Sequence, residues 1–172
     1  ILFVHGFSMK TEVVNFYTNK NFIHIKQTKT GFANVLREAI TSNFIRASDS
    51  IIFGMPDTIF EGNPFTDLVQ EPAICCALFL TDDKSKVDRL KLDSNSFSIK
   101  SEKDTTLSDY FWGVLKFDAE SLLLADSKNL FDEYTEVGQL LNYLGFTYKK
   151  FNKYIDLGTW PNYNRYLIHD YY

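Results

Sequence analysis

The chain has 172 residues, of which 45% are hydrophobic, so it can bury the core of one domain and is too apolar to be disordered. Its formal net charge of -4 argues against a nucleic-acid-binding protein, because binding to a phosphate backbone usually needs a basic face. A single nucleotide remains compatible with this charge, since a few backbone N–H groups, one metal ion and one or two lysines can hold it.

The cysteines and the apolar runs bear on the cellular compartment. Cys75 and Cys76 are adjacent in an apolar run. A disulfide scaffold needs separated pairs and a zinc site needs more ligands, so we expect both to be reduced core residues. The longest apolar stretch, residues 73–80, is much shorter than the roughly 20 residues of a membrane span, and no signal peptide is visible. We therefore expect a cytoplasmic protein with no membrane partner.

The first half of the chain predicts strands and helices in alternation. It opens directly on an apolar run, so we expect a single domain over residues 1–172 that is incomplete at its N-terminus. Short apolar runs predict strands at residues 1–5, 22–25 and 50–53, and helices are expected at 11–17 and 31–43. The second helix has apolar residues at i, i+3, i+4, i+7 and i+8, which are Phe32, Val35, Leu36, Ala39 and Ile40.

The second half continues the alternation. Strands are expected at residues 73–80, 87–93, 110–117, 146–151 and 154–157, and helices at 118–124, 134–144 and 161–168. Asp118 is suited to cap the first of these helices, Gly145 to end the second and Pro161 to begin the third. The alternation predicts an α/β fold, a Rossmann-like and mostly parallel sheet flanked by helices.

Ligands of open parallel sheets bind beyond the carboxyl ends of the strands, so polar residues at strand ends are candidates for a site. They are Gln27, Asp57, Glu102, Lys103 and Asp156. Each has a simpler interpretation that remains open. The aspartates could be turn or cap residues, the Glu-Lys pair a solvated ion pair, and the glutamine plain surface. The three histidines lack ligand-like spacing, and no Gly-rich phosphate loop or nucleophile elbow is present.

Five segments in chain order change the weight of these candidates. They are Gln27-x-x-x-Gly31-Phe32-Ala33, Gly54-Met55-Pro56-Asp57-Thr58-Ile59-Phe60, Ser101-Glu102-Lys103, Tyr110-Phe111-Trp112-Gly113-Val114 and Tyr154-Ile155-Asp156-Leu157-Gly158-Thr159. Together they resemble the sugar-phosphate nucleotidyltransferases, of the glucose-1-phosphate thymidylyltransferase type. The resemblance runs through nearly the whole chain and implies the nucleotide-diphospho-sugar transferase type of fold.

The resemblance also implies an activity: transfer of a nucleoside monophosphate from a nucleoside triphosphate to a sugar 1-phosphate, giving an NDP-sugar and pyrophosphate. Asp57 and Asp156 would be the catalytic pair that binds Mg2+, and Asp57 would also meet the nucleotide phosphates. Two carboxylates suit this metal, which takes oxygen ligands and few of them from protein. A homo-oligomer is compatible with the resemblance.

The resemblance assigns the remaining candidates to the two substrates. Gln27 and Gly31 would lie against the nucleobase, the glycine because its backbone can approach the ring closely. Glu102 would accept hydrogen bonds from sugar hydroxyls, Lys103 would meet the sugar phosphate, and Gly113 would leave room for the sugar.

Three features depart from the family pattern. The family's Gly-rich loop, which cradles the triphosphate, is absent from this sequence. Asp88 stands where relatives commonly have glycine beside the sugar, and Asp104 replaces the usual proline after Glu-Lys. These departures leave open a non-catalytic paralogue that binds a nucleotide or sugar nucleotide in a regulatory role. A glycosyltransferase, which also holds sugar nucleotides through acidic metal ligands, fits the segments around Glu102 and Asp156 less well.

Overall fold

The computed structural model describes residues 2–5, 23–26, 28, 31–55, 58–80, 89–91, 94–98, 107–134, 136–152, 154–157, 161, 163–164 and 167–168. The chain divides into two compact units, one made of Ile1–Asp49 and Asp118–Leu140 and the other of Ser50–Phe117 and Leu141–Tyr172. The single domain expected from the sequence stays a prediction.

The described residues of the first unit form two of the predicted strands, three whole helices and the start of a fourth, α6 (Val137–Leu144). The strands β1 (Leu2–His5) and β2 (Ile23–Lys26) pair in parallel, with Leu2 opposite Ile23. The whole helices are α2 (Phe32–Thr41), α4 (Ala119–Ser127) and α5 (Leu130–Glu133). The two strands, α2 and α4 confirm the sequence prediction, whereas α5 was not predicted. The helix expected at residues 11–17 lies outside the described residues.

Helix α2 buries the face that its periodicity predicts. Leu36, Ala39 and Ile40 are buried, and Ala33 joins them, while Phe32 is half-buried at the start of the helix. Helix α4 begins as predicted at Asp118, whose carboxylate accepts hydrogen bonds from the backbone N–H of Ser121 (2.7 Å) and from its hydroxyl (2.8 Å). The cap satisfies a backbone donor that has no partner inside the helix.

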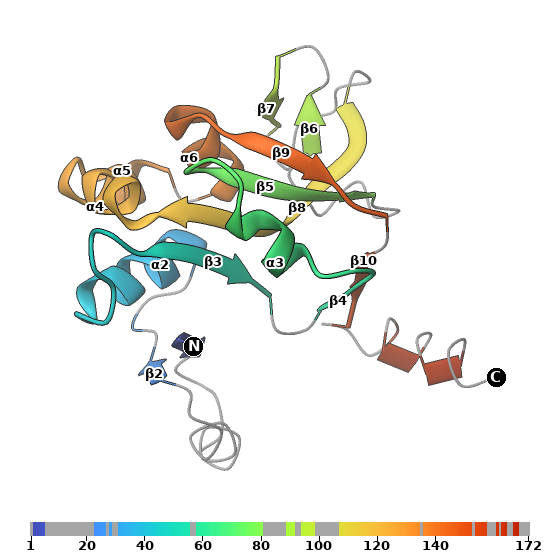
Figure 1. Cartoon of the computed structure of the whole chain (residues 1–172), viewed down its shortest axis with the longest axis horizontal. Helices are drawn as coiled ribbons and strands as arrows, with labels where there is room; N and C mark the ends of the chain where they lie inside the picture. Colours follow the sequence, from blue (N-terminus) through green and yellow to red (C-terminus); the bar gives the residue numbers. More distant parts are fainter. Residues whose placement is uncertain are drawn as a thin grey trace. The chain divides into compact units, whose positions relative to one another are not determined.

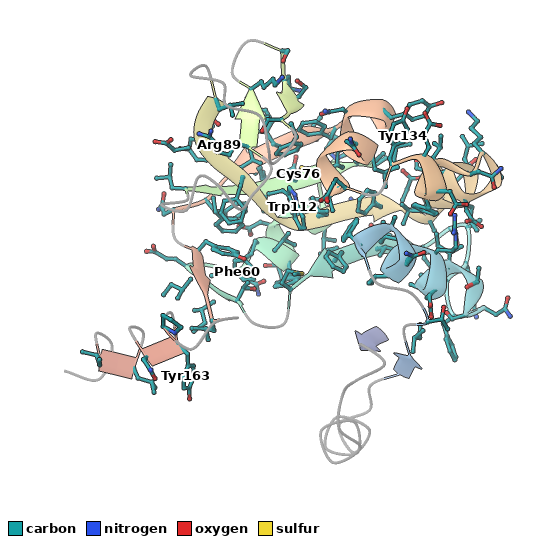
Figure 2. The ribbon with its side chains drawn as sticks, turned by 180° about the vertical axis from the view of Figure 1, so that it is seen from behind. Phe60, Cys76, Arg89, Trp112, Tyr134 and Tyr163 are labelled. Carbon is teal, nitrogen blue, oxygen red and sulfur yellow. The ribbon has the colours of Figure 1, made fainter. Side chains whose placement is uncertain are left out.

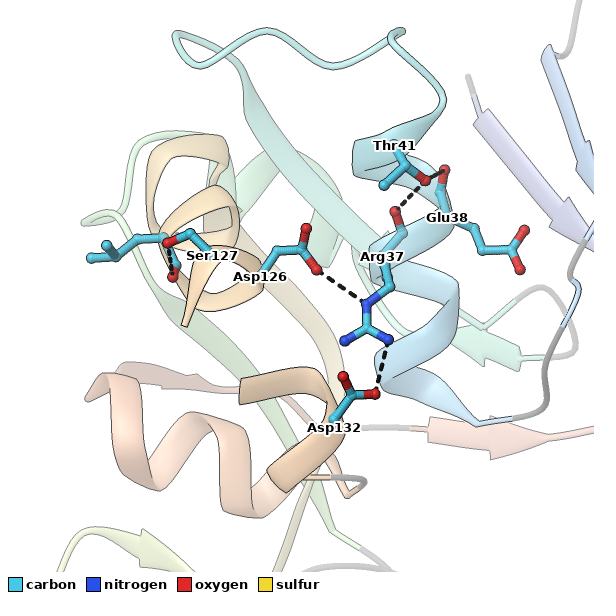
Figure 3. Close-up of polar contacts among 7 residues, drawn as sticks. Arg37, Glu38, Thr41, Asp126, Ser127 and Asp132 are labelled. Atoms are coloured by element: carbon cyan, nitrogen blue, oxygen red, sulfur yellow. Dashed lines mark hydrogen bonds and ion pairs between the residues drawn. The ribbon is translucent and has the colours of Figure 1, made fainter. Parts of the chain in front are cut away.

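One arginine joins the three whole helices of this unit. Arg37 of α2 donates through Nε to Asp126 of α4 (3.1 Å) and through Nη1 to Asp132 of α5 (3.0 Å), as Figure 3 shows. Its guanidinium also lies over the ring of Phe131, 5.7 Å from the ring centre. The contact with Asp126 is partly buried, because the two side chains are only 22% and 33% exposed, whereas Asp132 is 66% exposed and its ion pair is open to solvent.

The second unit is built on a six-stranded sheet with the order β7-β6-β8-β5-β9, and β3 also pairs with β8. The strands are β3 (Ser50–Gly54), β5 (Cys75–Leu80), β6 (Arg89–Lys91), β7 (Ser96–Phe97), β8 (Leu107–Asp118) and β9 (Thr147–Lys150). In Figure 1 the arrows of β3, β5 and β9 point the same way. The long strand β8 runs antiparallel to β5 and β6. The short strand β7 also runs antiparallel to β6. The predicted α/β fold is confirmed, and β7 and β8 are the strands that run against the common direction of its mostly parallel central sheet.

Strand β5 supplies the middle of this core. Residues 75–79 are at most 1% exposed, as expected of a central strand with apolar neighbours on both faces. Cys75 and Cys76 are both free, as predicted, and burial raises the pKa of each thiol. The neighbouring edge strand β9 is different, because all four of its residues, including Lys149 and Lys150, are exposed.

Helix α3 (Pro64–Val69), which the sequence interpretation missed, covers part of this sheet and contacts β3 and β5. Its first turn is capped by Asn63, whose side chain accepts a hydrogen bond from the N–H of Thr66 (3.2 Å). At its other end the ammonium of Lys116, on β8, donates to the carbonyls of Val69 (2.8 Å) and Glu71 (2.6 Å). The lysine is only 7% exposed, so these carbonyls compensate for its burial.

The last part of the chain follows the predicted order. Helix α6 (Val137–Leu144) buries Val137, Leu140 and Leu141, and Gly145 follows with a φ of 76°, a conformation that favours glycine. The described residues of the last predicted helix, from Pro161 onward, are helical. Among the described residues, no helix has both the length and the apolarity to cross a membrane.

We expect Arg37→Met to lower the free energy of unfolding by about 1 kcal/mol. Two charged hydrogen bonds are lost, while the apolar stem that packs in the helix interface is largely kept. Denaturant unfolding followed by circular dichroism would measure the change. The matched control is Arg46→Met, because Arg46 is exposed and its side chain should contribute little. Equal stability of the two variants would contradict a joining role for Arg37.

Candidate functional site

Two short strands of the second unit pair with each other, and one of them contains a predicted site residue, Asp156. Strand β10 (Tyr154–Asp156) pairs antiparallel with β4 (Thr58–Phe60), and the register sets Asp156 opposite Thr58. Thr58 directly follows Asp57 in the chain. Its hydroxyl donates to the carbonyl of Met55 at 2.7 Å. This hydrogen bond joins the first residue of β4 to the residue that follows β3.

Of the other predicted site residues, only the two glycines are among the described residues. Gly31 lies directly before α2 in the first unit, and Gly113 lies within β8 in the second. Gln27, Asp57, Glu102 and Lys103 lie outside the described residues, as does the side chain of Asp156. The structure therefore relates Asp156 to Thr58 by backbone pairing, and the predicted roles of all these residues stay predictions.

The β4–β10 pair adjoins a cluster of aromatic rings in the second unit (Figure 2, where Phe60 is labelled). Tyr154 of β10 lies 5.7 Å from Phe60 of β4, 5.5 Å from Phe79 of β5 and 4.7 Å from Phe111 of β8, measured between ring centres. Phe79 also stacks on Phe151 at 5.5 Å. Such separations are those of interacting aromatic pairs.

The absent side chain of Gly113 has a packing explanation. A Cβ atom there would lie 2.6 Å from the ring of Phe79 and 3.2 Å from that of Tyr154. The distance to Phe79 is too short for two carbon atoms, and the distance to Tyr154 is a tight contact, so the ring of Phe79 occupies the space that a side chain at this position would need. Room for a sugar, the role that the sequence resemblance implies, is a separate requirement that stays a prediction.

Gly31 is needed for its backbone conformation. Its φ of 102° and ψ of 151° fall in a region that essentially only glycine adopts. This conformation turns the chain into α2, so the glycine has a structural reason to be there whether or not a nucleobase lies against it.

The segment before α2 is anchored by a carboxylate. Glu38 of α2 accepts hydrogen bonds at Oε1 from the backbone N–H of Thr28 (2.6 Å) and from its hydroxyl (2.5 Å). Thr28 directly follows Gln27, the predicted base-contacting residue. Glu38 was not among the residues predicted to belong to a site. A polar residue on the face of a helix opposite its apolar stripe was the available signal, but such residues are usually only solvated.

The metal prediction depends on the two aspartates. Among the residues that the structure describes, no three or more His, Cys, Asp or Glu side chains are grouped so that they could hold a metal ion. A magnesium site formed by Asp57 and Asp156 needs only two protein ligands, and oxygen donors are the type that this metal takes. The residues present are thus of the right kind, and the Asp156–Thr58 pairing is compatible with the site.

No protein-family model matches this sequence, and no curated protein sequence matches it, but solved structures do. One was assigned as a glucose-1-phosphate thymidylyltransferase from Bacillus anthracis and contains sucrose. It aligns with a TM-score of 0.77 and 20% identity over 99% of this chain and 76% of its own. A nucleoside-diphosphate-sugar pyrophosphorylase from Vibrio cholerae RC9 aligns with a TM-score of 0.70 and 18% identity over 98% and 80% of the two chains. A UDP-glucose pyrophosphorylase in complex with UDP-glucose aligns with a TM-score of 0.70 and 13% identity over 97% of this chain and 80% of its own.

The chain has the sugar-phosphate nucleotidyltransferase fold. The resemblance found in the sequence is therefore confirmed at the level of the fold, and at these identities the structural likeness carries the fold alone.

We expect Gly113→Ala to destabilise the protein by about 1–3 kcal/mol, because the added methyl group overlaps the ring of Phe79. Thermal or denaturant unfolding would measure the loss. The test of the cause is a double-mutant cycle with Phe79→Leu, which removes the ring atoms that the methyl group meets. The double variant should be more stable than the sum of the single effects predicts, and strict additivity would refute this packing account.

Proposed function

We propose that this chain is a nucleotidyltransferase that couples a nucleoside triphosphate to a sugar 1-phosphate. The observation that carries the proposal is the β4–β10 register, in which Asp156 pairs with the residue that follows Asp57. The fold supports it as well, because the matched structures include several sugar-nucleotide pyrophosphorylases and one of them holds UDP-glucose.

In this proposal Asp57 and Asp156 hold one Mg2+ ion. Their carboxylates would supply oxygen donors of the kind that Mg2+ prefers. When bound, Mg2+ screens the negative charge of the phosphates and orients the α-phosphate. The hydrogen bond from the Thr58 hydroxyl to the carbonyl of Met55 joins the residues on either side of Pro56 and Asp57.

The reaction forms one P–O bond and breaks another. A phosphate oxygen of the sugar 1-phosphate attacks the α-phosphorus of the nucleotide, and the bond from that phosphorus to the oxygen shared with the β-phosphate breaks. Pyrophosphate leaves and the NDP-sugar remains. No side chain is needed as a nucleophile, since the protein contributes mainly by positioning and by electrostatic stabilisation.

The other candidate residues would hold the two substrates. Gln27 and Gly31 lie against the base in this proposal, and Thr28, the residue after Gln27, is held to α2 by its hydrogen bonds to Glu38. Glu102 and Lys103 take the sugar hydroxyls and the sugar phosphate. The cytoplasmic location and a homo-oligomeric state stay predictions.

We expect Asp57→Asn and Asp156→Asn each to lower kcat for pyrophosphate release by at least about 100-fold, because each removes a charged metal ligand. The assay combines Mg2+, each of the common nucleoside triphosphates and a panel of sugar 1-phosphates, so that base and sugar are identified together. The matched control is Glu61→Gln, which neutralises an exposed carboxylate just after β4 and should leave turnover unchanged. Circular dichroism checks that all variants are folded.

Full turnover in either aspartate variant would eliminate the metal pair. A wild-type protein that binds nucleotides or NDP-sugars, measured by calorimetry, but releases no pyrophosphate would favour the non-catalytic regulatory paralogue.

A further inference from the structure

The β4–β10 pair is too small to be stable by itself. It consists of three residue pairs, Tyr154 with Phe60, Ile155 with Ile59 and Asp156 with Thr58. An isolated two-stranded ladder is marginal in water even when it is longer, so side-chain packing has to hold this one in place.

The packing that holds it is concentrated at one end of β10. Tyr154 is the aromatic residue of β10, and its ring makes edge-on contacts with Phe60 (61° between ring planes) and Phe111 (89°). It also packs on Phe79, at an angle of 47°. The three partners belong to β4, β8 and β5, so this ring connects the small ladder to two strands of the central sheet. Phe60 of β4 adds a second connection, because its ring lies 5.1 Å from that of Phe79.

The sheet has a matching recess for this ring. Gly113 of β8 leaves the recess open, because a Cβ atom at this position would lie 3.2 Å from Cδ2 of Tyr154. The partners are themselves well fixed, since Phe79 is fully buried and Phe111 is 5% exposed. The ring of Tyr154 therefore packs against buried side chains, and its contacts on several sides oppose small shifts of the ring.

Asp156 stands two residues after Tyr154 on the same short strand. At about 3.4 Å of rise per residue, its Cα lies about 7 Å along the strand from the Cα of Tyr154, with one residue between them. A metal ligand has to be held to within a fraction of an ångström, which a three-residue ladder cannot do without an anchor.

We propose that Tyr154 is a positioning residue for the metal site: its ring, seated on Phe79 and Phe111 over Gly113, fixes the place of Asp156. The inference rests on the proposed function for the identity of the metal site. It goes beyond that function, because it assigns the accurate placement of a metal ligand to a side chain that contacts neither metal nor substrate.

The structure offers a matched control in Phe151. This half-buried residue stacks on the same Phe79 ring at 5.5 Å, but it follows β9 and is not part of the β4–β10 ladder. Phe151→Leu and Tyr154→Leu thus remove one ring each from the same cluster. A role in general stability predicts that both variants affect the site only in proportion to their loss of global stability, whereas a positioning role predicts a further effect in Tyr154→Leu when the two are compared at equal stability.

The first measurement is Mn2+ binding to the whole chain, followed by electron paramagnetic resonance with and without a nucleoside triphosphate. Mn2+ serves as a probe for a site of oxygen ligands. We expect Tyr154→Leu to weaken Mn2+ binding by at least about tenfold, equivalent to about 1.4 kcal/mol. Tyr154→Phe, which keeps the ring, and Phe151→Leu should stay within about twofold of the wild type. If Tyr154→Leu does not fold, Tyr154→Met takes its place, because a flexible thioether fills the recess without fixing the strand.

The second measurement does not depend on metal. Amide hydrogen exchange of residues 155 and 156 should be faster in Tyr154→Leu than in Phe151→Leu when the two are compared at equal global stability. Equal exchange, or equal Mn2+ affinity of the two leucine variants, would overturn the positioning role. A wild-type protein that binds no Mn2+ would instead overturn the metal site of the proposed function, and hydrogen exchange would then decide whether Tyr154 anchors the strand.

Discussion

The packing of the second unit depends on the contacts that other aromatic rings make with the ring of Phe79. It is fully buried on the central strand β5, and the rings of Phe60, Phe111, Phe151 and Tyr154 all lie against it. These five rings come from different segments of the chain, so one side chain sets the mutual arrangement of two sheet strands, the segment after β9 and the β4–β10 ladder. Aromatic rings suit this purpose because each buries a large area with few rotatable bonds.

The long elements could be predicted because their burial leaves a periodic trace in the sequence. The apolar run of β5, the 3.6-residue pattern of α2 and the cap of α4 at Asp118 each follow from a local rule that the structure obeys. Helix α3 was missed because it is only six residues long, too short for a periodic pattern, although Asn63 and Pro64 are a recognisable start signal. The antiparallel direction of β8 was also not predictable, since a strand's direction depends on connections that periodicity does not record.

The candidate site shows a similar division. The rule that ligands gather at strand ends made Asp57 and Asp156 candidates, and the family resemblance made them a pair. The register of β10 against β4 relates Asp156 to the neighbour of Asp57. Sequence reasoning did not find the aromatic support around Tyr154, because contacts between rings far apart in the chain have no local signature. The two glycines give a related lesson. Gly31 and Gly113 were selected for space beside a ligand, yet a backbone conformation and the packed ring of Phe79 already require glycine at these positions.

The exposed edge of the central sheet has a consequence for the behaviour of the protein in solution. Strand β9 pairs with β5 on one side, and its four residues include two exposed lysines. Lys149 forms an ion pair with Glu71, and the ammonium of Lys150 lies 4.5 Å from the ring centre of Tyr110. Ammonium groups along an edge strand disfavour its pairing with a strand of another molecule. Modification that removes these charges would therefore act first on the tendency to aggregate, while the buried core and the folding free energy that it supplies would be little affected.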